Sequence, residues 1–214
     1  MIDTVIFDMD GTLLDTLEDL TDATNVGLAH GGYPARTLEE IRRFVGNGVH
    51  TLMVKALPQE ASKADVEHCL TAFKEYYAQH WQDKTAPYAG IVPLLAELRR
   101  RGIKTAVISN KYEQAVVELC RDYFPGSFDA IRGEREGVPR KPAPEGIYSI
   151  LDELGAEKRS TVYVGDSEVD MATAKNAGLK SVGVTWGFRS RALLEEKGAD
   201  HIIDEPQQLL DVIS

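Results

Sequence analysis

The stretch that decides the fold is Thr4-Val-Ile-Phe-Asp-Met-Asp-Gly-Thr12. Its first four residues are β-branched or aromatic, which predicts a short buried strand. Asp8 ends this strand, and Asp10 and Gly11 are typical of a turn. Residues two apart in a strand share a face, so both carboxylates can reach one site if the strand continues. The stretch therefore predicts a strand with polar chemistry at its carboxyl end.

Other apolar runs repeat this pattern and alternate with helical segments. The further predicted strands are residues 104–108, 128–131, 161–164, 180–184 and 201–203. Apolar residues at three- and four-residue spacing predict helices over residues 92–101, 113–123, 145–154 and 169–176. Gly102, Gly155 and Gly178 are placed to end three of them. This alternation predicts the α/β class, with a Rossmann-like parallel sheet covered on both faces.

The alternation breaks between about residues 16 and 83, where only helical periodicity is found. Helices are expected over residues 17–30, 38–44, 49–57 and 63–77. Asp15 followed by Glu18 predicts an N-cap and a capping box for the first of them. We therefore expect an α/β core domain, residues 1–15 and 84–214, interrupted by a small helical cap domain, residues 16–83.

Composition limits the classes of partner. The net charge of −10 over 214 residues argues against nucleic acid and anionic membrane surfaces. No apolar run is long enough to cross a bilayer, and no secretory signal pattern is present, which predicts a cytoplasmic location. Cys69 and Cys120 are not in a C-x-x-C pair and are expected to be free thiols.

Three more polar clusters stand where strands end or helices begin. They are Ser109-Asn-Lys111, Lys141-Pro-Ala-Pro144 and Gly165-Asp-Ser-Glu-Val-Asp170. Each alone is explained by turn or capping chemistry. In an open parallel sheet, however, ligands bind beyond the carboxyl ends of the strands, so all of the clusters are expected at one rim.

Together these residues suit covalent phosphoryl transfer. Asp8 would attack phosphorus, while Asp10, kept protonated, would give a proton to the leaving oxygen. Gly11 would let the backbone approach the phosphate. The expected phosphate-binding residues are Gly11, Thr12, Ser109, Asn110 and Lys141.

The same site needs a cation. Asp8, Asp166 and Asp170 contribute three negative charges, which one Mg²⁺ together with Lys141 would balance. A phosphate monoester then brings about 1.5 to 2 further negative charges. Without the metal, three carboxylates would face this anion across a cleft of low dielectric constant. The charges therefore predict an absolute requirement for a divalent metal, with Mg²⁺ as the cofactor.

These clusters, in this order, resemble the four motifs of the haloacid dehalogenase superfamily. The resemblance spans nearly the whole chain and implies Asp8 as nucleophile and Asp10 as acid/base. It implies Mg²⁺ ligation by Asp8, the Asp10 carbonyl and Asp166. Asp170 would be a further ligand or a group behind the ligands. The helical block after the first motif is similar to the C1-type cap that closes over the site.

Within that superfamily the chain is most similar to phosphoglycolate phosphatases. The similarity rests on Phe44-Val-Gly-Asn-Gly48, on Ser109-Asn-Lys111 and on Val184-Thr-Trp-Gly-Phe-Arg189. It implies hydrolysis of a small phosphorylated metabolite, 2-phosphoglycolate, to glycolate and phosphate. Gly46, Asn47 and Gly48 would receive the substrate carboxylate with their backbone amides, unless they form only a turn between helices.

Several alternatives stay open at this point. A β-phosphoglucomutase-like mutase, a pyrophosphatase and a broad sugar-phosphate phosphatase share the core motifs. Outside the enzymes, a receiver-like protein or an inactive phosphate-binding protein would also use an acidic sheet edge. Asp10 argues against a dehalogenase, which lacks an acid at that position. The chain is expected to act as a monomer or homodimer.

Overall fold

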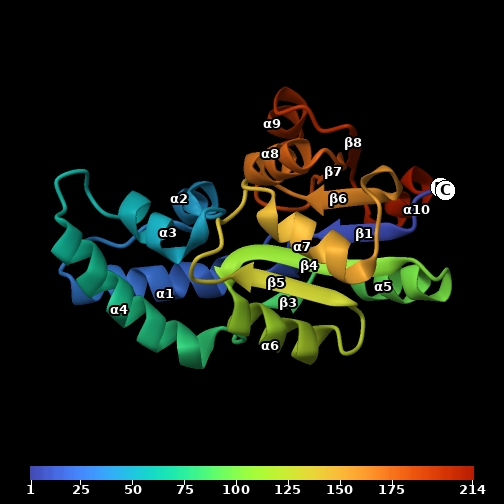
Figure 1. Cartoon of the computed structure of the whole chain (residues 1–214). Coiled ribbons are helices and arrows are strands. Elements are labelled where there is room, and N and C mark those ends of the chain that lie inside the picture. Colours follow the sequence, from blue (N-terminus) through green and yellow to red (C-terminus); the bar gives the residue numbers. More distant parts are fainter. The chain divides into compact units, whose positions relative to one another are not determined.

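The computed structural model describes all residues, 1–214, and contains a six-stranded parallel sheet (Figure 1). The strand order is β5-β4-β1-β6-β7-β8. The strand bounds are β1 Thr4–Phe7, β4 Lys104–Tyr112, β5 Ala130–Glu134, β6 Thr161–Gly165, β7 Lys180–Val184 and β8 His201–Ile203. The predicted α/β class is thereby confirmed.

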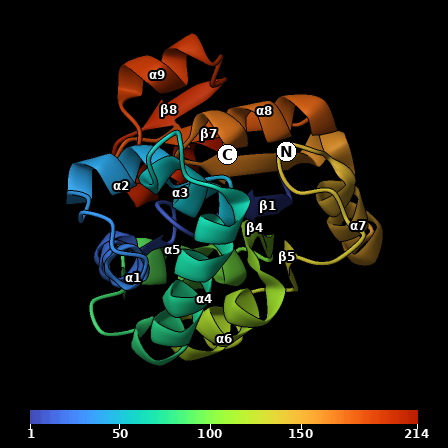
Figure 2. The ribbon, with the colours of Figure 1, turned by 90° about the vertical axis from the view of Figure 1, so that its left-hand side faces the viewer.

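Helices cover both faces of this sheet (Figures 1 and 2). Their bounds are α5 Ile91–Arg100, α6 Glu113–Tyr123, α7 Glu145–Leu154, α8 Glu168–Ala177, α9 Arg191–Glu196 and α10 Leu209–Val212. Two short 3₁₀ turns, Lys158–Ser160 and Pro206–Gln208, complete the connections. Helices α5 and α6 lie on one face, and α7 and α8 lie on the other, because the chain crosses the sheet in opposite directions on the two sides of β1.

The core between the sheet and α7 and α8 is closely packed. Ile6 and Ala106 from the sheet pack with Ile147 of α7 and Ala174 of α8, and all four are fully buried. Tyr163 of β6 lies in the same cluster with no exposed surface. A buried tyrosine needs a partner for its hydroxyl group, and that partner lies in the site described below.

Some element ends differ from the sequence-based expectation. β4 continues to Tyr112, and its pairing with β5 shifts register between Ile108 and Tyr112. β5 begins at Ala130, two residues later than expected, and runs on to Glu134. The residue types do not show where β4 and β5 end, because hydrogen-bond pairing with the neighbouring strand determines these ends.

The chain divides into two compact units, Met1–Leu14 with Pro87–Ser214 and Asp15–Ala86. We call them the parallel-sheet unit and the helical unit. The helical unit contains α1 Leu17–His30, α2 Leu38–Phe44, α3 Gly48–Ala56 and α4 Lys63–His80. The chain passes between the units through β2 Leu14–Asp15 and β3 Ala86–Pro87, which pair as a two-stranded sheet.

Capping boxes do occur in the helical unit, but not where the sequence predicts one. Thr37 with Glu40 caps α2, and Ser62 with Asp65 caps α4. The expected box of Asp15 with Glu18 is wrong. Thr16 is the N-cap residue of α1 and makes no side-chain cap, while Oδ1 of Asp15 accepts a hydrogen bond from the amide of Leu17 at 3.2 Å. None of the helices has the length and apolar character needed to span a membrane.

Candidate active site

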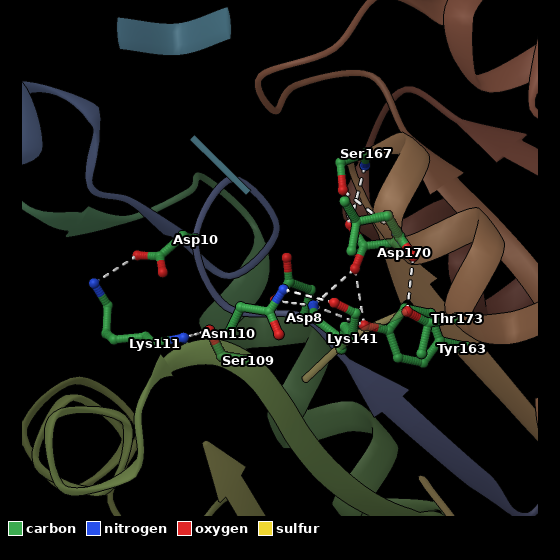
Figure 3. Close-up of polar contacts among 11 residues, drawn as sticks. Asp8, Asp10, Ser109, Asn110, Lys111, Lys141, Tyr163, Ser167, Asp170 and Thr173 are labelled. Atoms are coloured by element: carbon green, nitrogen blue, oxygen red, sulfur yellow. Dashed lines mark hydrogen bonds and ion pairs between the residues drawn. The ribbon is translucent and has the colours of Figure 1, made fainter. Parts of the chain in front are cut away.

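The polar clusters found in the sequence gather at the carboxyl ends of three central strands (Figure 3). Asp8 follows β1, Ser109 lies in β4 and Asp166 follows β6. Lys141 comes from the loop before α7. The strand order reverses direction at β1, and an open α/β sheet forms its ligand crevice at such a point.

Lys141 is the central cation of this site. Its Nζ lies 2.7 Å from Oδ1 of Asp8 and 2.8 Å from Oδ1 of Asp170, and it donates to the hydroxyl oxygen of Tyr163 at 3.0 Å. Lys141 is 5% exposed. Burial acts to lower the pKa of Lys141, but Asp170 and Asp8 hold that pKa well above its ordinary value. The ammonium group is therefore charged, with its three donors aimed at named acceptors.

Asp170 uses both carboxylate oxygens as hydrogen-bond acceptors. Oδ1 accepts from Nζ of Lys141 at 2.8 Å and from the hydroxyl of Tyr163 at 2.9 Å. Oδ2 accepts from the amide and the hydroxyl of Ser167, at 3.0 and 2.5 Å. Ser167 and Asp170 are also the N-cap residue and the third residue of α8, where they form a capping box. These four bonds fix Asp170 behind Lys141.

Asp166 is held by the loop that follows β7. Its Oδ2 accepts a hydrogen bond from the amide of Phe188 at 2.6 Å, which leaves Oδ1 available to a cation. Gly187 and Gly11 pack directly against it: a Cβ at Gly187 would lie 2.3 Å from Cβ of Asp166, and one at Gly11 would lie 2.4 Å from Oδ2. Gly11 also has a φ of +86°, which a side chain would strain.

Asp8, Asp166 and Asp170 form a cluster of buried carboxylates that could hold a metal ion. One oxygen from each lies within 4.8 Å of the others. Burial, followed by repulsion from Asp170, raises the pKa of Asp8 to about 7, although Lys141 opposes the rise. Burial and the charges of Asp170 and Asp8 likewise raise the pKa of Asp166 well above its ordinary value. Lys141 alone does not balance these three carboxylates, and a divalent cation with oxygen ligands would supply the missing positive charge.

The expected phosphate-binding residues surround this cluster. Ser109 and Asn110 are 5% and 6% exposed, and the side-chain amide of Asn110 donates to the carbonyl of Lys141 at 3.1 Å. Thr12 is fully buried, and its hydroxyl has no hydrogen-bond partner. The carbonyl of Thr12 accepts from the indole nitrogen of Trp186 at 3.0 Å. A buried hydroxyl without a partner is costly, and a phosphate oxygen would satisfy it.

The carboxylate of Asp10 does not share the direction of Asp8. Its Oδ1 lies 3.2 Å from Nζ of Lys111, and Figure 3 shows the two side chains pointing toward each other, away from Asp8. The two-residue alternation fails here because β1 ends at Phe7. The charge balance drawn from the sequence also omits Lys111, whose side chain is 6% exposed. The acid/base role of Asp10 stays a prediction.

Gly46, Asn47 and Gly48 belong to the helical unit. α2 ends at Phe44 and α3 begins at Gly48, so Gly46 and Asn47 lie in the turn between the two helices and Gly48 is the first residue of α3. Gly46 has a φ of +126° and Gly48 a φ of +80°, conformations that favour glycine. The turn accounts for both glycines, and substrate binding by their amides stays a prediction.

The sequence patterns predict no role for several residues of this site. Lys111 follows Ser109 and Asn110 in a cluster that turn chemistry explains, and Phe188 contributes only its backbone amide. Tyr163 looked like an ordinary strand residue in an apolar run. One signal was available for it, since a tyrosine in a buried strand must find a hydrogen-bond partner near the strand end.

Tyr163 links the hydrophobic core to the charged cluster, which yields a prediction. We expect Tyr163→Phe to lower kcat/KM by about 10-fold and the free energy of unfolding by about 1–3 kcal/mol. The change leaves the buried oxygen of Asp170 and one donor of Lys141 each short of a partner. Burial raises the pKa of Tyr163 well above its ordinary value, so the hydroxyl keeps its proton and its donor role in wild-type protein. Steady-state kinetics and thermal unfolding would measure both effects.

Tyr148→Phe is the matched control. The hydroxyl of Tyr148 donates to the carbonyl of Asn176 at 3.3 Å on an exposed surface. Both quantities should stay near the wild-type values in this variant. Wild-type kcat/KM in Tyr163→Phe would show that its hydroxyl does not position Lys141.

Comparison with known proteins agrees with this geometry. The sequence model of the haloacid dehalogenase-like hydrolases matches residues 5–184. Phosphoglycolate phosphatase of Pseudomonas putida (strain KT2440) is 34% identical over 96% of this chain and 78% of its own length. Phosphoglycolate phosphatase 1 of Pseudomonas aeruginosa (strain PAO1) is 33% identical over the same shares.

Solved structures show the same fold. A structure from Lactobacillus delbrueckii subsp. bulgaricus has a TM-score of 0.95 and 39% identity, covering 99% of this chain and 98% of that one. CbbY from Rhodobacter sphaeroides, solved in complex with phosphate, has a TM-score of 0.75 and 28% identity, covering 98% and 96%. The chain therefore belongs to the haloacid dehalogenase-like hydrolase family and is a phosphatase of that family.

Proposed function

We propose that this phosphatase is Mg²⁺-dependent and hydrolyses 2-phosphoglycolate through an aspartyl phosphate on Asp8. The observation that carries the proposal is the buried group formed by Asp8, Lys141 and Asp166. Asp8 follows the central strand, is 8% exposed, and lies 2.7 Å from the ammonium of Lys141. A phosphate group bound by the ammonium of Lys141 would therefore lie next to the carboxylate of Asp8.

The donor set suits Mg²⁺. Asp8 and Asp166 would hold the ion with carboxylate oxygens and Asp10 with its carbonyl, which are the hard ligands that Mg²⁺ prefers. Asp170 is committed to Ser167, Tyr163 and Lys141, so we assign it to positioning Lys141 rather than to direct ligation. When bound, Mg²⁺ would neutralise charge on the carboxylates and the phosphate.

The reaction proceeds in two displacements. In the first, an oxygen of Asp8 forms a bond to phosphorus, and the bond from phosphorus to the leaving oxygen breaks with its electron pair. Asp10 gives its proton to that oxygen, so the alcohol departs neutral. In the second, Asp10 takes a proton from water, which attacks phosphorus and releases Asp8 as a carboxylate. The sum is the addition of water to a monoester to give an alcohol and phosphate.

The transferring phosphoryl group would be bound by donors from several elements. Lys141 would supply the charge, and the buried hydroxyls of Thr12 and Ser109 together with the amide of Asn110 would supply hydrogen bonds. The helical unit, with the turn Gly46-Asn-Gly48, would act as the cap that excludes water during transfer. The names of the Pseudomonas relatives support 2-phosphoglycolate as the substrate.

Rates over a panel of monoesters and related compounds test this substrate. The panel contains 2-phosphoglycolate, a hexose phosphate, pyrophosphate and a nucleoside monophosphate, each measured with Mg²⁺. We expect 2-phosphoglycolate to have the largest kcat/KM. If pyrophosphate or a sugar phosphate exceeds it by several decades, the substrate is wrong and the two-displacement chemistry stands. Isomerisation of a hexose phosphate without release of phosphate would favour the mutase alternative.

A further inference from the structure

The ion pair between Asp10 and Lys111 is not needed by the chemistry described above. Nζ of Lys111 lies 3.2 Å from Oδ1 of Asp10, and the two side chains are only 6% and 15% exposed. Lys111 is therefore a nearly buried ammonium at the catalytic rim of the sheet, separate from Lys141 (Figure 3). A buried charge is costly unless it has a partner or a function.

The backbone holds Lys111 in this position. It is the last residue but one of β4, within the stretch where the pairing with β5 shifts register. Its amide donates to the hydroxyl oxygen of Ser109 at 3.1 Å. A Cβ at Gly133 of β5 would lie 2.7 Å from the carbonyl oxygen of Lys111, so the two strands are in close contact there. A register shift of this kind redirects side chains at the end of a strand.

The proposed role of Asp10 as the general acid would place the leaving group beside Lys111. A general acid must lie within hydrogen-bond distance of the oxygen that it protonates. If Asp10 protonates the leaving oxygen, the ammonium that contacts the same carboxylate is next to the departing alcohol. Lys141, by contrast, contacts Asp8, at the side of the nucleophile. With Asp10 as the acid, the two lysines would therefore lie at opposite ends of the scissile bond.

We propose that Lys111 binds a carboxylate on the leaving alcohol and so makes the enzyme selective for phosphate esters of short hydroxy acids. In such a substrate one carbon joins the ester oxygen to the carboxylate, so a group that contacts the acid/base residue can also contact the carboxylate. The inference rests on the proposed function, because it assumes that Asp10 protonates the leaving oxygen.

Charge supports this assignment. The chain has a net charge of −10, and a phosphorylated hydroxy acid brings its carboxylate in addition to the phosphate charges. Lys141 is already engaged by Asp8 and Asp170. A second anionic group on the substrate therefore calls for a second cation, and Lys111, which one carboxylate, that of Asp10, contacts at 3.2 Å, would provide it at the leaving-group end.

The test compares two substrates that differ at one group. The substrates are 2-phosphoglycolate and 2-hydroxyethyl phosphate, which has a hydroxymethyl group in place of the carboxylate. We expect Lys111→Met to lower the ratio of their kcat/KM values by about 10- to 100-fold. Lys111→Arg should restore most of that ratio because it keeps the charge. If Lys111→Met only misplaced Asp10, kcat/KM would fall by the same factor for both substrates, and their ratio would not change.

Lys104→Met is the matched control. Lys104 begins the same strand, is exposed, and donates from Nζ to the carbonyl of Leu154 at 2.5 Å. The ratio of the two kcat/KM values in Lys104→Met should equal the wild-type ratio. If Lys111→Met does not fold, Lys111→Gln provides a shorter uncharged side chain for the same comparison.

Two results would overturn the inference. An unchanged ratio in Lys111→Met, with both rates reduced alike, would make Lys111 a residue that only positions Asp10. A wild-type enzyme that hydrolyses 2-hydroxyethyl phosphate as well as 2-phosphoglycolate would exclude carboxylate selection by any residue, while leaving the phosphatase chemistry intact. An error in the proposed substrate would give a third result. In that case 2-phosphoglycolate would be hydrolysed with a much lower kcat/KM than the sugar phosphates or pyrophosphate.

Discussion

Replacement of Asp8 by asparagine removes turnover, with an expected loss on the order of 10⁴-fold or more in kcat. An amide oxygen is a far weaker nucleophile than a carboxylate oxygen, and the reaction has no second route to the covalent intermediate. The fold should persist because the substitution keeps the shape of the side chain. The changes would be measured as kcat with 2-phosphoglycolate and as the temperature of thermal unfolding.

Asp3→Asn is a control for the loss of a single carboxylate near the same strand. Oδ1 of Asp3 accepts a hydrogen bond from the hydroxyl of Thr4 at 2.8 Å, before β1 begins. It should retain wild-type kcat. Turnover at the wild-type rate in Asp8→Asn would dismiss Asp8 as the nucleophile.

Removal of divalent metal by exhaustive chelation abolishes activity, and Mg²⁺ restores it. Asp8, Asp166 and Asp170 would otherwise face the phosphate with Lys141 as the one ammonium that contacts two of them. Burial, and after it repulsion between the neighbouring carboxylates, raises the pKa of Asp8 and of Asp166, and a bound cation would oppose both effects. The measurement is kcat after chelation and after addition of Mg²⁺ or Ca²⁺. Full turnover in the chelated enzyme would contradict the metal requirement.

The pKa of Asp8 also gives metal binding a pH dependence. In metal-free protein it is raised from 3.8 to about 7, so the folded protein retains a proton that the unfolded chain loses between these values. The stability of metal-free protein should therefore fall as pH rises from about 4 to about 7. Mg²⁺ competes with that proton and should bind more tightly above pH 7.

Thermal unfolding with and without Mg²⁺, at pH 5 and at pH 8, would show this competition. The increase in unfolding temperature caused by Mg²⁺ should be larger at pH 8, because at a fixed concentration a ligand with a lower Kd stabilises the folded state more. Lys104→Met protein should show the same difference as wild type, since Lys104 lies at the opposite end of its strand from the rim. An equal increase at both pH values would show that no proton is displaced.

The strands and the gathering of the clusters could be predicted because both depend on local pattern. An apolar run that ends at Asp8 or Asp166 marks the carboxyl end of a strand, and parallel strands bring such ends to one edge. In the helical unit, periodicity gives the bounds of α1 and α2, whereas α3 begins and ends one residue earlier than expected and α4 continues three residues further. The sequence model of the family and the solved structures with this fold indicate the same family.

The directions of individual side chains could not be predicted from these patterns. Lys111 faces Asp10 because β4 changes register, and Asp170 faces Lys141 because Ser167 is the N-cap residue of α8 and holds the Asp170 side chain. The amide of Phe188 reaches Asp166 from a loop distant in sequence. Each of these contacts depends on tertiary packing rather than on the residue types alone. The failed capping box at Asp15 has a similar cause, since Thr16 rather than Asp15 takes the N-cap position.

Trapping of the covalent intermediate tests the central claim most directly. Wild-type enzyme would be mixed with excess 2-phosphoglycolate and Mg²⁺, quenched in acid within one turnover, and reduced with borohydride. An aspartyl phosphate is reduced to homoserine, so mass spectrometry of the peptide that contains Asp8 should show homoserine at position 8 and an unchanged residue at position 10. Rapid turnover with no modified residue, or modification at a residue other than Asp8, would contradict the account.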